Sequence, residues 1–265
     1  MIVKRNPRSH NFLISYAIAF LALIAASAGI FGSIYLEDDW FVSQMIGQDV
    51  LTLVVAMGLL VLPFIQNKKI KVWQGGFFAY MVYTYVFYAF SVRFNILFLV
   101  YVALSSLSAL GLFQIFRQLA GCDLEGPKGW AIKGGSAYLI VVCLVLSLLW
   151  LGDIFSRFMG KPLLDTPTGE PLTPVYVLDL GFVIPAGLYG AVQALRKRYW
   201  GYIITAVMLV MMATMGLALM AMTLGQYAYG FGFQGFLAVF WFVLGTCGLF
   251  LAVLYLKSLQ IRSRP

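Results

Sequence analysis

Charged residues are scarce in this 265-residue chain. They make up 11% of it, whereas hydrophobic residues make up 62%. Soluble domains carry about 25% charged residues, so this composition is typical of an integral membrane protein. No hydrophilic stretch is long enough to form a separate soluble domain, and residues 1–265 are therefore predicted to form a single membrane domain.

Cysteine and histidine are also rare, and this excludes several kinds of site. Cys143 and Cys247 fall within apolar runs and Cys122 between two of them, which argues against an exported disulfide framework. The single histidine, His10, lies in the basic N-terminal segment, which argues against a bis-histidine haem and a His-dependent triad. Nucleotide-binding and hydrolase motifs are absent. We expect no cofactor and no metal, and we favour a protein that is not an enzyme.

Eight apolar runs of membrane-spanning length follow one another along the chain. An α-helix needs about 20 residues to cross the hydrocarbon core of a bilayer. The predicted spans are residues 11–36, 49–65, 73–90, 95–116, 134–151, 175–195, 202–224 and 235–256. The fold class is therefore all-α, a polytopic transmembrane bundle of eight helices. The basic head and Ala26-Ser27-Ala28 also suit a signal peptide, but this apolar run is longer than such peptides have.

The basic residues fall mostly on alternate connections between these spans. Of the 18 Lys and Arg residues, 15 lie on one side, and only Arg93, Arg157 and Lys161 lie on the other. Cytoplasmic loops carry such an excess, so both termini are predicted to be cytoplasmic. The net charge of +8 then reflects orientation toward anionic lipid. We expect membrane lipid as a partner and no nucleic acid.

The sequence indicates an internal repeat of two four-helix halves, residues 11–118 and 134–258. Residues 35–38 (YLED) and 150–153 (WLGD) close the first and fifth predicted helices with the same aromatic-Leu-x-Asp pattern. Each is followed by a Met, a Gly and then a helix with an aspartate near its start, Asp49 or Asp179. Four helices per half would give both halves the same orientation, as in parallel-repeat transporters. The alternative is chance similarity between helices that share general membrane signals.

Asp49 and Asp179 are the main candidate site residues, because both lie inside apolar runs. An ionisable group in a membrane span costs roughly 2.5–3.5 kcal/mol on insertion scales, so it usually has a partner or a function. The repeat would place the two carboxylates across one interface at an outward-facing site, near Arg93, Asn95 and Gln48. The structural alternative is an ion pair between Asp179 and Arg93 that closes the bundle.

Other polar and kinked positions accompany these carboxylates. Tyr80, Thr84 and Tyr88 lie on one helix face at i, i+4 and i+8, where they either line a polar groove or hydrogen-bond to neighbouring helices. Pro185 is predicted to kink or break the sixth helix just past Asp179. Six methionines between residues 208 and 222 either pack adaptably or bind Cu(I), and we favour packing because no His or Cys accompanies them.

Three segments give the chain a resemblance to a known group of proteins. They are Gly47-Gln48-Asp49, residues 95–104 (NILFLVYVAL) and Leu178-Asp179-Leu180-Gly181. With them the chain resembles a family of uncharacterised bacterial multi-pass integral membrane proteins. The resemblance implies the bacterial cytoplasmic membrane and implies no activity.

Three classes of function fit these patterns. We predict transport or binding of a small solute, ion or proton through an outward-facing carboxylate site. The first alternative is a non-catalytic membrane subunit or scaffold that docks a protein partner or a second copy of the chain. The second is a membrane-embedded enzyme acting on lipid, with the same carboxylates as acid and base. A cavity that reaches both aspartates would favour transport or catalysis, and a tightly packed, Arg-paired interior would favour the subunit.

Overall fold

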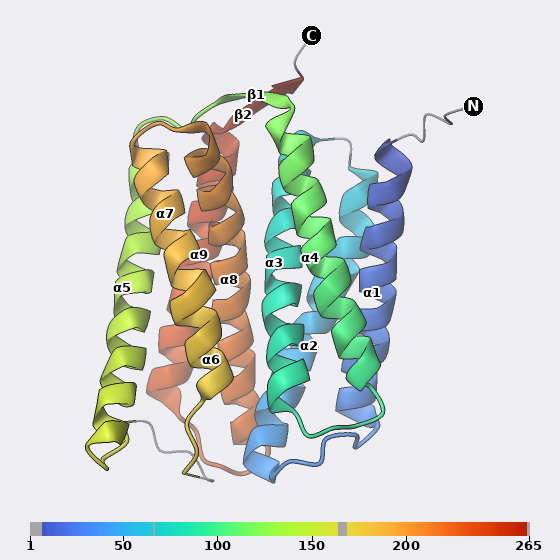
Figure 1. Ribbon diagram of the computed structural model, residues 1–265, viewed down its shortest axis with the longest axis vertical. Coiled ribbons are helices and arrows are strands. Elements are labelled where there is room, and N and C mark those ends of the chain that lie inside the picture. The colour runs from blue at the N-terminus through green and yellow to red at the C-terminus, as the bar shows by residue number, and fades with distance from the viewer. Residues whose placement is uncertain (1–6, 66, 164–168, 264–265) are drawn as a thin grey trace.

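The chain folds into a bundle of long antiparallel helices, as a computed structural model shows (Figure 1). The structure describes residues 7–65, 67–163 and 169–263. The helices are α1 (Pro7–Phe31), α2 (Asp39–Val61), α3 (Lys68–Ser91), α4 (Phe98–Ala120), α5 (Trp130–Phe158), α6 (Thr173–Leu178), α7 (Ile184–Leu195), α8 (Tyr199–Ala228) and α9 (Gly235–Ser258). A 3₁₀ turn, η1 (Leu62–Phe64), ends α2, and a π-helical turn, η2 (Asp179–Val183), joins α6 to α7. The prediction of an all-α bundle is confirmed.

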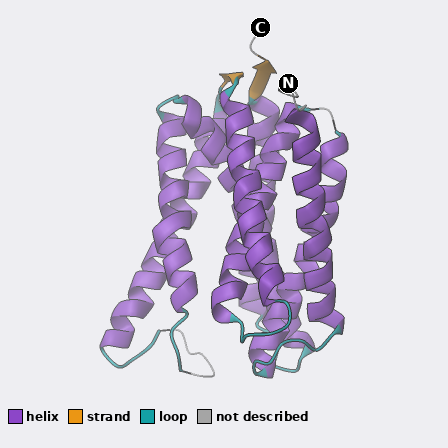
Figure 2. Cartoon of the chain, turned by 45° about the vertical axis from the view of Figure 1, so that its right-hand side comes forward, coloured by secondary structure: helices purple, strands orange, loops and turns teal. Residues whose placement is uncertain are grey.

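Seven of the described helical segments are long and apolar enough to cross a membrane. They are Leu13–Phe31, Asp39–Phe64, Phe98–Ala120, Trp130–Phe158, Thr173–Leu195, Tyr199–Ala228 and Gly235–Ser258. The remaining long helix, α3, has 24 residues but begins with three lysines in its first four positions and buries several polar side chains. It lies inside the same bundle, so eight antiparallel segments make up the described fold (Figure 2).

The two ends of the bundle differ in charge. Both termini and a short antiparallel ribbon of β1 (Cys122–Glu125) and β2 (Gln260–Ser263) lie at one end (Figure 1). We call this the basic end, because Lys68 at the start of α3 and the connections with Lys128 and Arg196 lie there. The opposite end carries Glu37 and Glu170 in its connections, and we call it the acidic end.

Helix α8 forms the centre of the bundle, with α2, α3, α7 and α9 packed around it. Glycines allow close approach: a Cβ at Gly47 of α2 would collide with the backbone of α8 at Ala221. Small residues at such crossings are typical of helix packing in lipid. Met208, Met211 and Met212 of α8 are buried in the apolar core. Their surroundings fit the packing interpretation of the methionine-rich segment.

Three predicted helix boundaries are wrong in ways that bear on the site. The helix that carries Asp49 begins at Asp39, ten residues before its predicted start, because the Asp38 side chain caps it by accepting from the Phe41 N–H at 2.9 Å. Helix α5 continues to Phe158, so the segment 150–153 lies inside the helix rather than at its end. Helix α1 ends at Phe31, so Tyr35 lies in the connection that follows it.

Candidate functional site

Asp49 lies in the interior of the bundle, in α2, and is held by two tyrosines. Its side chain is 1% exposed. The Tyr35 hydroxyl donates to Oδ2 at 2.5 Å, and the Tyr88 hydroxyl of α3 donates to Oδ1 at 3.1 Å. Gly29 of α1 leaves the space for this group, because a Cβ there would overlap Oδ2 and the Tyr35 ring. Each carboxylate oxygen thus accepts from a neutral donor.

A second polar network lies beside Asp49, between α2 and α3. The Gln48 amide donates to the Tyr80 hydroxyl and to Thr84 Oγ1, both at 2.9 Å. Thr52 Oγ1 lies 3.1 Å from the Tyr80 hydroxyl. All four side chains are buried. The structure therefore brings together Asp49, Gln48, Tyr80 and Tyr88 of the predicted site residues, and it confirms that Tyr80, Thr84 and Tyr88 share one face.

Asp179 lies at the junction of α6 and the π-helical turn. Its side chain is 6% exposed, and Trp150 of α5 donates its indole N–H to Oδ2 at 2.7 Å. The Tyr83 hydroxyl of α3 is close enough to the same carboxylate to interact with it electrostatically. Like Asp49, this carboxylate is surrounded by neutral donors in the described part of the chain.

The backbone at Asp179 departs from α-helical geometry. The Ile184 N–H bonds to the Asp179 carbonyl, five residues back instead of four. Pro185 explains this turn, because it has no N–H and its ring collides with the carbonyl four residues earlier. The predicted interruption near Pro185 is thus present, as a π-helical turn that begins at Asp179. Such turns occur frequently at functional sites.

The ion-paired carboxylate of the bundle is Asp153 rather than Asp179. Asp153 of α5 is fully buried and accepts from Arg157 Nε and from the Leu163 N–H, both at 2.8 Å. The Tyr176 hydroxyl of α6 also donates to it. The sequence shows the i, i+4 spacing of Asp153 and Arg157, which could have identified this pair.

Arg93 and Asn95 do not join either aspartate. Arg93 Nη1 donates to the Leu36 carbonyl at 2.7 Å, and the Arg93 backbone N–H donates to Glu37 Oε1 at 2.5 Å. The predicted alternative, an ion pair between Arg93 and Asp179, is therefore wrong. Asn95 accepts the Leu97 N–H at 2.9 Å and shapes the turn before α4. Both residues lie in the connection that follows α3, outside the helices that enclose the aspartates.

The two aspartates lie on different flanks of α3. Tyr88 reaches Asp49 and Tyr83 reaches Asp179. These tyrosines are five positions apart, which is about 140° around a helix. Among the described residues no hydrogen bond joins the two carboxylates, so α3 lies between two separate cages. The sequence does not assign Tyr35, Tyr83 and Trp150 to the cages, although the predicted repeat makes Tyr35 and Trp150 equivalent positions.

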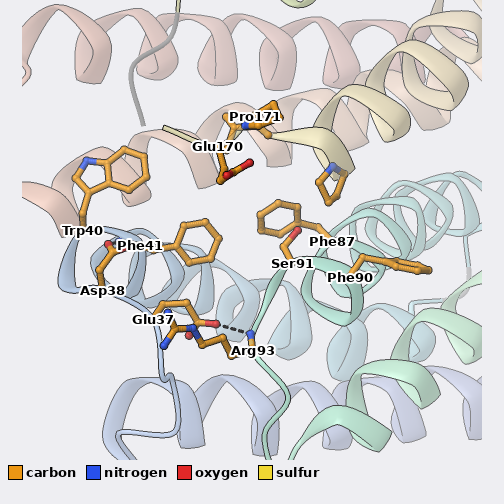
Figure 3. Close-up of a pocket in the computed structure, with 12 residues that line it drawn as sticks. Glu37, Asp38, Trp40, Phe41, Phe87, Phe90, Ser91, Arg93, Glu170 and Pro171 are labelled. Atoms are coloured by element: carbon orange, nitrogen blue, oxygen red, sulfur yellow. Dashed lines mark hydrogen bonds between the residues drawn. The ribbon is translucent and has the colours of Figure 1, made fainter. Parts of the chain in front are cut away.

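A pocket of about 280 Å³ opens at the acidic end, between the two halves of the chain (Figure 3). Its lining is Glu37, Asp38, Trp40, Phe41, Phe87, Phe90, Ser91, Arg93, Glu170, Pro171, Leu172 and Pro174. Neither Asp49 nor Asp179 lines it. It does lie near Asp179, because Phe87 follows Tyr83 by one helical turn and Pro174 precedes Asp179 by five residues. The two candidate aspartates are thus not paired with arginine among the described residues, and the pocket does not reach both of them.

The described side chains offer no ready metal centre, since no three His, Cys, Asp or Glu residues among them could together hold an ion. Comparisons with protein-family models, with curated proteins and with solved structures found no match to the chain. The resemblance to uncharacterised bacterial membrane proteins therefore stays a prediction.

Proposed function

We propose that the protein binds and carries a small cation, a proton included, across the bacterial cytoplasmic membrane, with Asp179 as the exchanging carboxylate. One observation carries this proposal. Asp49 and Asp179 are buried among apolar helices, and the partners the structure describes for them are hydroxyl and indole donors. A charged carboxylate without a basic partner is unstable in such surroundings, so each must hold a proton or bind a cation.

The arrangement of aromatic donors supports a functional repeat. Residues 35 and 150 occupy matching places in the two proposed halves, and each donates to the aspartate of its own half. In parallel-repeat transporters the site lies near the interface of the repeats. Here α3 of the first half contacts both α8 and α6 of the second and carries tyrosines for both carboxylates.

Asp179 is better placed than Asp49 to exchange its proton or cation. Asp49 lies in a continuous α-helix, with one tyrosine on each oxygen. Asp179 begins a π-helical turn and lies deeper in the bundle than the pocket, five residues beyond Pro174 of the lining. A helix whose hydrogen-bond ladder already shifts can move at that point with little further loss of backbone bonding.

The charge distribution supports an orientation for this carrier. The basic end has the excess of Lys and Arg that cytoplasmic loops show. We propose that the termini face the cytoplasm and that the pocket at the acidic end opens outward. Cations would then be drawn to the pocket by its own carboxylates and would approach Asp179 from outside.

Proteoliposomes with a trapped pH-sensitive dye test this proposal. Small ammonium compounds, K⁺ and Na⁺ are added outside one at a time, and the internal pH is recorded. We expect at least one of these cations to change the internal pH in wild-type vesicles. The change should be lost in Asp179→Asn, because an amide cannot exchange a proton.

Asp39→Asn is the matched control, since Asp39 lies in the exposed first turn of α2 and does not line the pocket. It should keep the wild-type response. A response of wild-type size in Asp179→Asn would contradict the proposal. It would also be contradicted if, for every cation, the internal pH changed equally in vesicles with the wild-type protein and in empty vesicles.

A further inference from the structure

We infer that the pocket at the acidic end binds a compact organic ammonium ion, with aromatic rings against its alkyl groups and carboxylates around its charge. If the ammonium ion is also the transported cargo, the inference rests on the proposed function. As a binding site, it stands on the pocket alone. The two can therefore be tested separately.

Aromatic rings form a large part of the pocket wall. Trp40, Phe41 and Phe87 line it, and the ring centroids of Phe41 and Phe87 are 6.2 Å apart at an interplanar angle of 35°. Figure 3 shows these side chains around the same space, with Glu170 beside them. The faces of aromatic rings attract cations, and alkylammonium ions are the ligands for which such sites are best suited.

The charges of the lining favour a cation over an anion. Glu37, Asp38 and Glu170 supply three carboxylates against the one guanidinium of Arg93, a formal charge of −2. The guanidinium donates to the Leu36 carbonyl, so one of its donors is already engaged. An anionic ligand would be repelled by these carboxylates.

Two buried oxygen atoms in this lining have no hydrogen-bond partner within the described chain. They are Glu37 Oε2 and Ser91 Oγ. Burying an acceptor without a partner is costly, and such groups usually have one. A ligand with N–H or O–H donors would satisfy them. This observation is independent of the aromatic wall and of the net charge.

Size and composition narrow the class of ligand further. At about 280 Å³ the pocket is slightly smaller than the usual range for drug-sized ligands, about 300–1,000 Å³. An inorganic cation such as Ca²⁺ requires six to eight oxygen ligands, whereas much of this lining is aromatic and aliphatic. A choline-sized ammonium ion satisfies both limits.

The position of the pocket also links it to Asp179. Phe87, in the lining, is four residues beyond Tyr83 on α3, a rise of about 6 Å. A positive charge near a carboxylate favours the charged form of that carboxylate. An ammonium ion in the pocket would thereby favour release of the Asp179 proton, which is the exchange that an antiporter requires.

Choline and its uncharged isostere 3,3-dimethylbutan-1-ol provide the central test. The two have the same shape and differ in the charge of one atom. Binding to the detergent-purified protein is followed by isothermal titration and by the thermal unfolding midpoint. We expect choline to bind and to raise the midpoint, and we expect the isostere to bind at least tenfold more weakly. Equal binding of the two would overturn the inference.

Two lining variants with matched controls locate the site. Glu170→Gln and Phe87→Leu should each weaken choline binding by about tenfold. Asp39→Asn and Phe94→Leu make the same chemical changes at exposed positions outside the lining and should bind like wild type. Glu170 lies outside the helices, so its variant tests the site even where Phe87→Leu impairs folding. Wild-type binding by Glu170→Gln would overturn the inference.

Two further arms separate this inference from the proposed function and identify the source of the ammonium group. Asp179→Asn should still bind choline, so a transport response of wild-type size in this variant, with choline binding retained, contradicts the carrier and leaves the pocket intact. Choline binding is then compared in nanodiscs of phosphatidylglycerol with and without phosphatidylcholine. Competition by phosphatidylcholine identifies a lipid headgroup as the ligand, and equal binding identifies a free solute.

Discussion

Asp49 and Asp179 differ in how firmly the fold holds them. Asp49 lies in an unbroken α-helix, with a tyrosine on each oxygen and a glycine that fits its carboxylate closely. Asp179 begins a π-helical turn, and a Cβ at Gly181 in that turn would meet no neighbouring atom. Similar burial thus goes with a closely packed carboxylate in an unbroken helix in one half and with an interrupted helix in the other. The following predictions test this difference.

The largest expected effect is on stability when each carboxylate is removed. Asp49→Ala leaves the Tyr35 hydroxyl without its acceptor and the Tyr88 hydroxyl with only the Met45 carbonyl, at 3.3 Å. The loss of the carboxylate partner costs about 1–3 kcal/mol for each hydroxyl. We expect the free energy of unfolding to fall by roughly 2–6 kcal/mol. Asp179→Ala should lower it by roughly 1–3 kcal/mol, because the π-helical turn can relax around the gap. Unfolding in mixed detergent micelles, followed by tryptophan fluorescence, measures both. A larger loss at Asp179 would reverse the assignment of the rigid cage.

A pair of glycine substitutions tests the fit of the two cages without touching a carboxylate. Gly29→Ala places a methyl group against the Asp49 carboxylate and the Tyr35 ring. Overpacking of this kind costs about 1–3 kcal/mol. Gly181→Ala adds the same group to open space in the π-helical turn, so we expect the unfolding midpoint to stay near that of wild type. Equal midpoints for the two variants would show that Asp49 is not tightly enclosed.

Two tyrosines of α3 allow a matched comparison of single hydroxyl groups. Tyr88→Phe removes a donor to Asp49, and Tyr83→Phe removes the hydroxyl beside Asp179. Tyr88→Phe should lower stability by about 0.5–1.5 kcal/mol, the usual net contribution of a hydrogen bond, and Tyr83→Phe should lower it by no more than that. Only Tyr83→Phe should also change the cation-driven pH signal in proteoliposomes. A change in that signal with Tyr88→Phe alone would make Asp49 the exchanging group.

The smallest expected effect comes from Glu125 at the basic end, which serves as a reference for pH titrations. Its carboxylate pairs with Lys128 at 2.5 Å, and this hydrogen bond, with the attraction between the charges, lowers the pKa of Glu125 below its ordinary 4.5. A carboxylate whose pKa is lowered by folding stabilises the fold at pH values above its pKa in the unfolded state. This stabilisation is lost as the pH falls through its pKa in the folded state. Wild type and Glu125→Gln should therefore have parallel stability curves above about pH 5. Curves that diverge there would contradict this assignment.

The spans and several site residues could be predicted from the sequence because the signals are local. A run of about 20 apolar residues predicts a membrane span by itself. The face shared by Tyr80, Thr84 and Tyr88 follows from helical periodicity alone. The sequence predicts a start of α2 that is ten residues late, because the polar stretch that begins this helix is not typical of a membrane span. Its capping by Asp38 and the burial of its inner face extend the helix past the apolar run.

The partners of each carboxylate depended on contacts across the bundle. The sequence shows Arg93 near the same end as Asp179, but the chain leaves α3 before Arg93 and turns it toward the Leu36 carbonyl. The nearest suitable donor to Asp179 is instead Trp150, which an extended α5 carries into the interior. Sequence distance is a poor guide here, because antiparallel helices bring residues 29 to 39 positions apart into contact.

By itself the sequence determined that the chain is an all-α, multi-pass membrane protein with two aspartates in its apolar segments, because length, hydropathy and the cost of burying charge are properties of local composition. The packing of the helices sets the rest: Tyr35 and Tyr88 hold Asp49, Arg157 pairs with Asp153, and Asp179 lies on a π-helical turn near a pocket. Hydrogen bonds and close packing act over a few ångströms, so the crossing of the helices settles which donors meet which carboxylate.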